Sequence, residues 1–344
     1  MGLINGTGLP ISLGLALAEH QYSKGDSNIS ATELGLSPRI RQLRARHSVD
    51  VEVKSRIYAL LGTLTHKILE SSARQMVKDN QANQLKAVNQ VLTEWLDRQS
   101  PNDEGEVDLP LKIEKAIWEA IKLTVWEDHN IMLEKRMFAD VNGWIVSGQC
   151  DSFNALTGVM EDYKLTSVWK YIYNSKEEWE KQLNTYRWIW HLNGYEVKEG
   201  VVHGIFRDWS KTKADIDPKY PQNQWEMMPI TMWPLEKCKA HVEERVRIHQ
   251  DAEGMEEKNL PLCTDEERWA DPEKWAVKKE GGKRAIKLFD SLAETKDWMA
   301  RYTKKGEKLV VEHRPSESTR CVHNYCEVRD HCPFGLAIKN AISK

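Results

Sequence analysis

The stretch Trp144-Ile145-Val146-Ser147-Gly148-Gln149-Cys150-Asp151, followed shortly by Glu161-Asp162-Tyr163-Lys164, decides the fold that this sequence predicts. Its apolar and β-branched flanks indicate two short strands, with Thr157-Gly158 as the turn between them. Because side chains alternate faces along a strand, Asp162 and Lys164 share one face, and Glu161 and Tyr163 share the other. We therefore expect Asp151, Asp162 and Lys164 to converge at one end of a hairpin.

This combination of charges suits metal-dependent phosphate chemistry. The carboxylates of Asp151 and Asp162 are oxygen ligands of the kind that a hard divalent cation takes. The Lys164 ammonium can act as a point charge on a phosphate or on an attacking water. The alternative is a solvated hairpin with ordinary surface charges, because charged residues make up 29% of the chain. One Asp-X-Lys triplet does not separate the two interpretations.

The order of the predicted elements indicates an α/β fold with a mixed sheet. The Asn142-Gly143 pair predicts a tight turn between two strands, and Ser30 with Glu33 predicts a capping box. A second capping box is expected at Ser175, with Gly194 ending that helix. Expected helices cover 53–77, 82–98, 111–126, 175–192, 234–249 and 292–302, and expected strands cover 131–138, 144–149, 159–165, 196–206, 226–233, 285–289 and 308–313.

Three further patterns lie on the predicted helices. His66 and Glu70 are four residues apart and share a helical face, as do Gln182 and Tyr186. A lone histidine on such a helix is more often a packed or surface residue than a ligand, and a shared face is also what simple packing on a sheet produces. A basic cluster follows Pro38, and it either forms a solvated helix face or contacts phosphate. Its expected DNA-binding residues are Arg39, Arg41 and Arg44.

Taken in order, these motifs resemble those of the PD-(D/E)XK nuclease superfamily. They are His66, Asp151 after Gly148, Asp162-Tyr163-Lys164, and Gln182-x3-Tyr186. The resemblance covers roughly residues 30–210 and is strongest with the RecB-like branch, which includes AddB-type nuclease domains and phage exonucleases. It implies a restriction-endonuclease-like core, with a central mixed β-sheet flanked by helices. It also implies a metal-dependent deoxyribonuclease, an exonuclease of phage DNA recombination or processing.

The resemblance assigns roles to individual residues. Lys164 orients the attacking water and stabilises developing negative charge, while Gln182 and Tyr186 support the lysine and touch the DNA strand. Mg²⁺ or Mn²⁺ is the implied metal, and a site with a histidine ligand accepts Mn²⁺ more readily than an all-oxygen site does. Glu161 replaces Asp162 only if the strand register is shifted, and Glu70 either holds a metal-bound water or is a surface residue. The implied metal ligands are His66, Asp151, Asp162 and the carbonyl of Tyr163.

The 344 residues allow one large domain with an appendage, and the net charge of -3 shows no strongly basic footprint. We expect an N-terminal arm over 1–30, a nuclease core over 31–253 and a small cysteine-bearing α+β module over 254–344. The first residues lack the basic segment of a signal peptide, and no apolar run approaches ~18 residues. A cytoplasmic protein is therefore expected, and the resemblance implies that it is phage-encoded and acts in a bacterial host.

Six cysteines without a secretion signal indicate reduced thiols or metal ligands rather than disulfides. Cys321, Cys326 and Cys332 form a cluster near the C-terminus. Cys263 is the expected fourth ligand, with His323 as the runner-up. The resemblance favours a [4Fe–4S] cluster, a histidine ligand would favour Zn²⁺, and three unlinked thiols are the plain alternative. Ser37 stands before Pro38 where related nucleases carry a cysteine, and Cys150 and Cys238 are expected to be buried, apolar-like thiols.

DNA is the expected partner, together with a recombinase or single-strand-binding protein, and no membrane is expected. Two rival functions belong to other classes. One is a catalytically silent DNA-binding or inhibitory protein on a nuclease fold, and the other is a structural protein with a zinc-stapled C-terminus. The presence of Asp151, Asp162 and Lys164 together argues against the catalytically silent protein, because a nuclease fold that has lost its activity tends to lose one of these residues.

Overall fold

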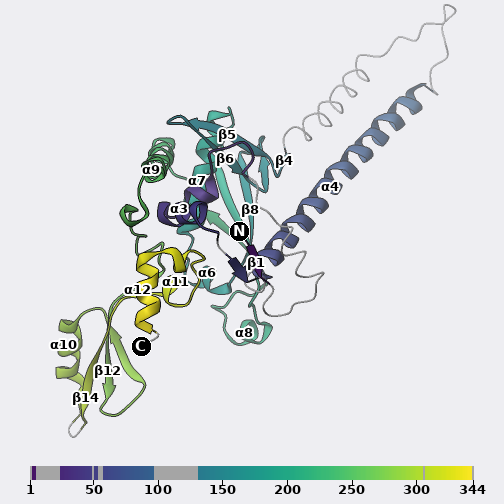
Figure 1. Cartoon of the computed structure of the whole chain (residues 1–344). Coiled ribbons are helices and arrows are strands. Elements are labelled where there is room, and N and C mark those ends of the chain that lie inside the picture. The colour runs from purple at the N-terminus through teal and green to yellow at the C-terminus, as the bar shows by residue number, and fades with distance from the viewer. Residues whose placement is uncertain are drawn as a thin grey trace, which may run out of the picture. The chain divides into compact units, whose positions relative to one another are not determined.

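The chain is a mixed α/β protein in which two compact units are built from interleaved stretches of sequence (Figure 1). The computed structural model describes residues 2–4, 24–48, 50–52, 57–96, 131–304 and 307–342. We call residues 5–35 with 52–247 the sheet unit, and residues 1–4, 36–51 and 248–344 the cysteine unit. The expected boundary near residue 253 thus has an exception, since 36–51 belong with the C-terminal residues.

A five-stranded mixed sheet with the order β10-β9-β8-β7-β4 organises the sheet unit. The central pair, β8 and β9, is parallel, with Tyr163 opposite His203, and the other pairs are antiparallel. The strands are β4 (Ile131–Leu133), β7 (Ser152–Asn154), β8 (Val159–Thr166), β9 (Glu199–Phe206) and β10 (Trp225–Ile230).

The parallel pairing follows from a helical crossover between β8 and β9, since parallel strands need a long connection. The crossover contains α6 (Val168–Ile172) and α7 (Glu177–Leu192). Trp179 and Leu183 of α7 pack with Val202 of β9 and Met228 of β10, so α7 covers one face of the sheet. The predicted capping box at Ser175 is wrong, because Lys176 is the N-cap and no side chain caps it. The predicted end is confirmed, with Gly194 at a φ of 85° just after Asn193.

A second, three-stranded sheet holds the first half of the motif. It has the order β2-β6-β5, formed by β2 (Ile29–Ser30), β5 (Arg136–Val141) and β6 (Trp144–Gln149). Asn142 and Gly143, both with positive φ, make the predicted turn between β5 and β6. The expected hairpin between β6 and β8 is wrong, because the chain changes sheet at Cys150-Asp151 and pairs β8 with β7 instead.

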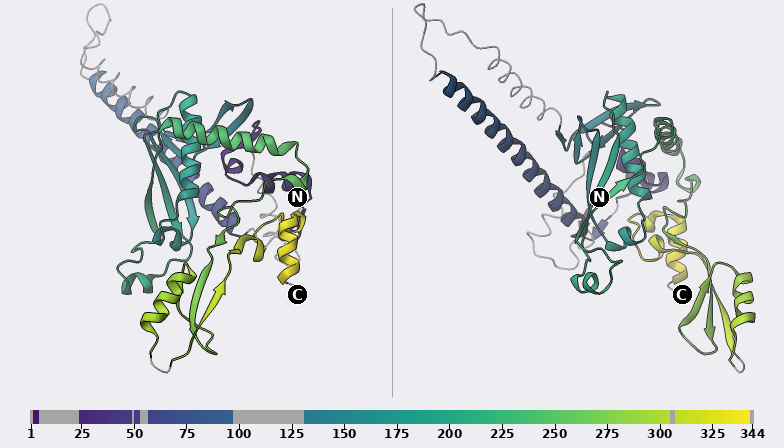
Figure 2. Two further views of the ribbon diagram at one scale, coloured as in Figure 1. Left: turned by 90° about the vertical axis from the view of Figure 1, so that its left-hand side faces the viewer. Right: turned by 180° about the vertical axis from the view of Figure 1, so that it is seen from behind.

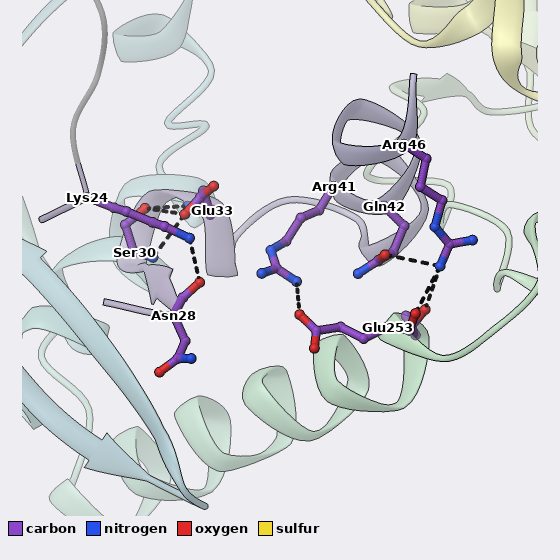
Figure 3. A network of polar contacts seen from close by, with 9 residues as sticks. Lys24, Asn28, Ser30, Glu33, Arg41, Gln42, Arg46 and Glu253 are labelled. Carbon is purple, nitrogen blue, oxygen red and sulfur yellow. Dashed lines mark hydrogen bonds and ion pairs between the residues drawn. The ribbon is translucent and has the colours of Figure 1, made fainter. Parts of the chain in front are cut away.

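Four further helices complete the described part of the sheet unit. The predicted capping box at Ser30 and Glu33 is confirmed and starts α2 (Ala31–Leu34), beside the Lys24 to Asn28 contact in Figure 3. The two helices expected over 53–77 and 82–98 are one continuous helix, α4 (Ile57–Leu96), since nothing in 77–82 breaks it. The helix expected over 111–126 lies outside the described residues. The remaining helices are α8 (Lys211–Ile216) and α9 (Leu235–Glu253), whose last residues enter the cysteine unit.

The cysteine unit packs around Ile40 and Leu43 of α3 (Pro38–Arg46), with Leu260, Val328 and three of the cysteines. Its other short elements are β1 (Gly2–Ile4) and β3 (Asp50–Glu52), which pair, and η2 (Glu257–Asn259), α11 (Thr319–Val322), η3 (Arg329–His331) and α12 (Pro333–Ile342).

A small module is inserted between Cys263 and Cys321. It has a three-stranded antiparallel sheet of order β13-β12-β14, with α10 along one face (Figure 2). A short pair, β11 (Ala270–Asp271) and β15 (Glu317–Ser318), closes its base. The structure confirms the strands expected near 285–289 and 308–313, which are β13 (Ala285–Phe289) and β14 (Leu309–Arg314). It also confirms the helix expected over 292–302, which is α10 (Leu292–Tyr302). The strand β12 (Lys274–Lys279) was not predicted.

Candidate metal centre

The candidate centre begins where the chain passes from one sheet to the other. Asp151, 9% exposed, accepts a hydrogen bond at Oδ2 from the Tyr163 backbone N–H at 2.5 Å. Its Oδ1 lies 3.1 Å from Nδ1 of His66 on α4. The hydrogen bond that His66 donates to the Asp151 carboxylate raises the pKa of His66 above its usual value, against the opposing effect of burial. The structure therefore brings the predicted ligands His66 and Asp151 together. Asp162 is not part of the group of ligand atoms that contains them, and the role of the Tyr163 carbonyl stays a prediction.

Glu134 is a further acidic residue at this centre, which sequence reasoning missed. Among the described residues, the ligand atoms of His66, Glu134 and Asp151 form a group within 4.8 Å of one another. Burial raises the pKa of Glu134, and the hydrogen bond that Gln149 donates to it acts in the opposite direction. The neighbouring carboxylate of Asp151 raises this pKa further. Glu134 also has a φ of 51°, the left-handed region that is unusual for such a residue. Strained backbone of this kind collects at functional sites.

Asp162 and Lys164 lie side by side on one face of β8. The Lys164 ammonium is 2.7 Å from Asp162 Oδ2, an ion pair whose angles are poor for a hydrogen bond. Asp162 is 2% exposed, and burial raises the pKa of its carboxyl group. Burial lowers the pKa of Lys164, but the Asp162 carboxylate outweighs it and the net shift is upward. The lysine is therefore held protonated beside the acidic group.

Glu161 belongs to the other face, as the alternation predicted. It lies 3.2 Å from Nε2 of His203, which stacks on the Tyr163 ring. The His203 hydrogen bond lowers the pKa of Glu161, with burial acting in the opposite direction. This pairing leaves Asp162, and not Glu161, on the side of Lys164. Glu70, the other acidic candidate, is paired with Arg74 at 2.8 Å.

Gln182 and Tyr186 contact each other through a 2.7 Å hydrogen bond on α7. Tyr186 packs directly on Gly148 of the motif, because a Cβ there would lie 2.7 Å from Tyr186 Cδ1. The glycine before Asp151 thus lets α7 approach the strand. The roles of Gln182 and Tyr186 toward Lys164 and DNA stay predictions.

The basic cluster on α3 makes contacts within the cysteine unit. Arg39 is 4% exposed and donates to the carbonyls of Leu260 and Pro261, so its prediction as a DNA contact is wrong for a residue this deeply buried. Arg41 pairs with Glu253 at 3.3 Å, as Figure 3 shows, and Arg44 pairs with Glu327. Arg41 and Arg44 stay predictions, since each would have to exchange an acidic partner for a phosphate.

The four predicted cluster cysteines line one apolar pocket of the cysteine unit. Arg39 and Phe334 also line it, and Arg39 Nη1 lies 3.7 Å from Cys332 Sγ. His323, the runner-up ligand, instead pairs with Glu317 at 3.5 Å and is absent from the lining. Burial raises the pKa of three of these thiols. The pocket thus contains Cys263, Cys321, Cys326 and Cys332.

Cys263 lies beside the position at which related nucleases carry a cysteine and this chain does not. Its Sγ lies 3.2 Å from Oγ of Ser37, the residue that stands where related nucleases carry a cysteine. A single tetrahedral Zn²⁺ with 2.3 Å bonds would hold sulfurs roughly 3.8 Å apart. Among the described residues no three thiols fall within 4.8 Å of one another, so their spacing is wider than one zinc ion needs.

Comparison with known proteins adds little to this geometry. No family model matches the chain, and no curated protein matches it. One similar solved structure is described as the crystal structure of SSO0001; at 14% identity it covers 69% of this chain and 85% of its own, with a TM-score of 0.38. A likeness this weak carries no argument about function. No helix in the described part of the chain has the length and apolar character needed to cross a membrane.

Proposed function

We propose that this chain is a divalent-metal-dependent deoxyribonuclease of the PD-(D/E)XK type, an exonuclease that hydrolyses phosphodiester bonds in phage DNA recombination or processing. One observation carries the proposal. His66, Glu134 and Asp151 offer ligand atoms within 4.8 Å of one another, and Asp151 also accepts the backbone N–H between Asp162 and Lys164. Three acidic groups, an imidazole and an ammonium from several segments of the sheet unit suit phosphate chemistry better than a solvated surface does.

The donor set fits Mg²⁺ or Mn²⁺. Carboxylate oxygens suit both ions, and the His66 nitrogen favours Mn²⁺ over an all-oxygen site. His66, Glu134, Asp151 and Asp162 are the residues that would hold the ion, with the Tyr163 carbonyl as a further candidate. When bound, such a cation would supply charge neutralisation at the scissile phosphate and lower the pKa of bound water. The acidic groups of the chain crowd together without it, which is the charge arrangement that a cation relieves.

The protein's own groups supply orientation and a fixed charge. Lys164 is kept protonated by Asp162, and its ammonium can orient the attacking water and stabilise charge that develops on the phosphate. Because Asp162 is buried and rigidly placed on β8, the lysine needs little reorganisation during the reaction. The Tyr163 backbone N–H holds Asp151 in place, so the two halves of the motif are fixed relative to each other.

A paired substitution tests the proposal sharply. Asp162→Asn should abolish cleavage of labelled linear DNA in Mg²⁺ or Mn²⁺, while Glu161→Gln, the neighbouring residue on the opposite face, should retain it. Asp151→Ala and Lys164→Ala should each lower the rate at least ~10²-fold. Circular dichroism and thermal melting control for folding. Full activity in excess EDTA, or loss in Glu161→Gln with retention in Asp162→Asn, would refute the assignment.

We also propose that the cysteine pocket holds a [4Fe–4S] cluster, which attaches the C-terminal residues to the rest of the cysteine unit and so stabilises the folded state. The wide spacing of the thiols favours this cluster over Zn²⁺. The buried Arg39 guanidinium is a cation beside groups that become anionic when they bind metal, and it would stabilise either site. Anaerobic purification followed by iron and zinc analysis and a visible spectrum tests it. Iron far below the four atoms per chain that one [4Fe–4S] cluster contains, or zinc near one equivalent in its place, would exclude the cluster.

A further inference from the structure

The inserted module has a charge balance unlike that of the rest of the chain. Residues 272–316 contain 12 Lys and Arg against 7 Asp and Glu, a net charge of +5, whereas the whole chain carries -3. The chain leaves at β11 and returns at β15, which pair at the base of the module. Neither the metal centre nor the cysteine pocket uses this segment. Its positive charge therefore needs another explanation.

The basic residues concentrate at the end of the module farthest from this base. The turn over 280–284 joins β12 to β13, and the segment 303–308 leads from α10 into β14. Lys279 at the end of β12 pairs with Leu309 at the start of β14. The Glu280 N–H donates to the Lys308 carbonyl at 2.9 Å. The described parts of the two loops consequently lie next to each other, and we call residues 279–284 with 303–308 the basic tip.

The cations of the basic tip outnumber its acidic residues. Its sequence, KEGGKR with TKKGEK, contains six basic and two acidic residues. The acidic ones are already used, because Glu307 lies 3.2 Å from Lys279, and Glu280 lies 3.6 Å from Lys308. Three exposed cations have no acidic partner among the residues that the structure describes. They are Lys283, Arg284 and Lys304.

The composition of the basic tip indicates what it binds. Neither loop contains an aliphatic or aromatic side chain. Protein interfaces usually have an apolar or aromatic centre, which is missing here. Contacts to a nucleic-acid backbone need cations and close approach, and they need no apolar surface. Gly281, at a φ of 73°, and Gly282 keep the turn narrow and free of side chains between the cations.

We propose that the basic tip is an auxiliary nucleic-acid arm, in which Lys283, Arg284 and Lys304 contact backbone phosphates without reading sequence. This inference deepens the proposed nuclease function and rests on it for the identity of the ligand. The arm contributes affinity for DNA and leaves the chemical step to the metal centre. Each contact releases counterions, so binding through it weakens as salt rises.

The test compares two triple variants that lose the same charge. The tip variant is Lys283→Ala/Arg284→Ala/Lys304→Ala. The control variant is Lys211→Ala/Lys239→Ala/Lys258→Ala, whose exposed side chains have acidic partners. Fluorescence anisotropy with a short labelled DNA duplex in EDTA measures binding without cleavage. Single-turnover cleavage with enzyme in excess, in Mn²⁺ and low salt, measures the chemical step.

Three lost phosphate contacts should lower the slope of log affinity against log salt by about 2.7. By the same relation, affinity should fall by up to ~500-fold near 0.1 M salt and converge with wild type near 1 M. The control variant should lose far less, and single-turnover cleavage by the tip variant at saturation should match wild type.

The outcomes separate the two proposals. A tip variant that binds as wild type does, or a control variant that weakens equally, overturns the arm even if the wild type cleaves DNA. A wild type that binds no duplex overturns it as well. If the tip variant alone loses binding while the wild type cleaves nothing in Mg²⁺ or Mn²⁺, the arm stands and the nuclease proposal fails.

Discussion

Replacing Glu134 by glutamine tests the centre at the residue that only the structure revealed. The change keeps the shape of the side chain and removes one carboxylate charge. Glu134 lies with His66 and Asp151 in one group of ligand atoms, so its loss should weaken divalent-metal binding. Even residues that support metal ligands indirectly cost ~10–100-fold in affinity when they are changed.

The size of the effect can be worked out as a melting shift. With Mn²⁺ at 100 times the wild-type dissociation constant, binding stabilises the native state by about 2.7 kcal/mol. A 10–100-fold loss of affinity at the same concentration leaves about 0.4–1.4 kcal/mol. At 2–4 °C per kcal/mol for a unit of ~150–250 residues, the Mn²⁺-induced rise in Tm should drop from about 5–11 °C to about 1–6 °C.

The metal-free variant should behave in the opposite way. Burial and nearby carboxylates raise the pKa of Glu134 in the folded state, so its ionised form destabilises the native state at neutral pH. Removing that charge should leave the Tm in EDTA equal to or above that of wild type. Differential scanning calorimetry with and without Mn²⁺ measures both quantities. The reasoning is refuted if Glu134→Gln keeps the full Mn²⁺ shift, or if Glu161→Gln, the matched change on the opposite face, loses as much.

Three further predictions concern other parts of the chain. Gly148→Ala should destabilise the protein by about 1–3 kcal/mol in urea titrations, because its Cβ would lie 2.7 Å from Tyr186 Cδ1; an unchanged midpoint would contradict this contact. Cys263→Ser should lose iron, and Ser37→Cys/Cys263→Ser should regain it, since the two side chains lie 3.2 Å apart; a double variant that stays iron-free would argue against ligand exchange. Burial lowers the pKa of His241 from its usual 6.5 to about 4, so the unfolded state takes up a proton first and stability should fall as pH drops from 6.5 toward 4. His241→Leu should lose less stability over that range, as acid-side melting curves can show.

The sequence by itself determined the features that depend on local periodicity and backbone conformation. The alternation along β8 puts Asp162 and Lys164 on one face and Glu161 on the other, and the contacts agree. The turn at Asn142-Gly143 follows from two residues that tolerate positive φ. Such features require only neighbours in the chain, so a short stretch of sequence contains the whole cause.

Only the tertiary structure decided which distant segments meet. Glu134 lies inside the strand predicted over 131–138 and carries no motif, but the structure ends β4 at Leu133. Glu134 joins the centre because β4 pairs with β7 and its own N–H donates to the Asp151 carbonyl. A charged residue breaking an apolar strand was the one weak signal for it. The basic cluster after Pro38 predicts that Arg39 is a surface cation, yet long-range packing buries it against the cysteine pocket. Cys263 meets Ser37 across more than two hundred residues of sequence. These outcomes depend on how whole elements pack together, and no local pattern encodes that choice.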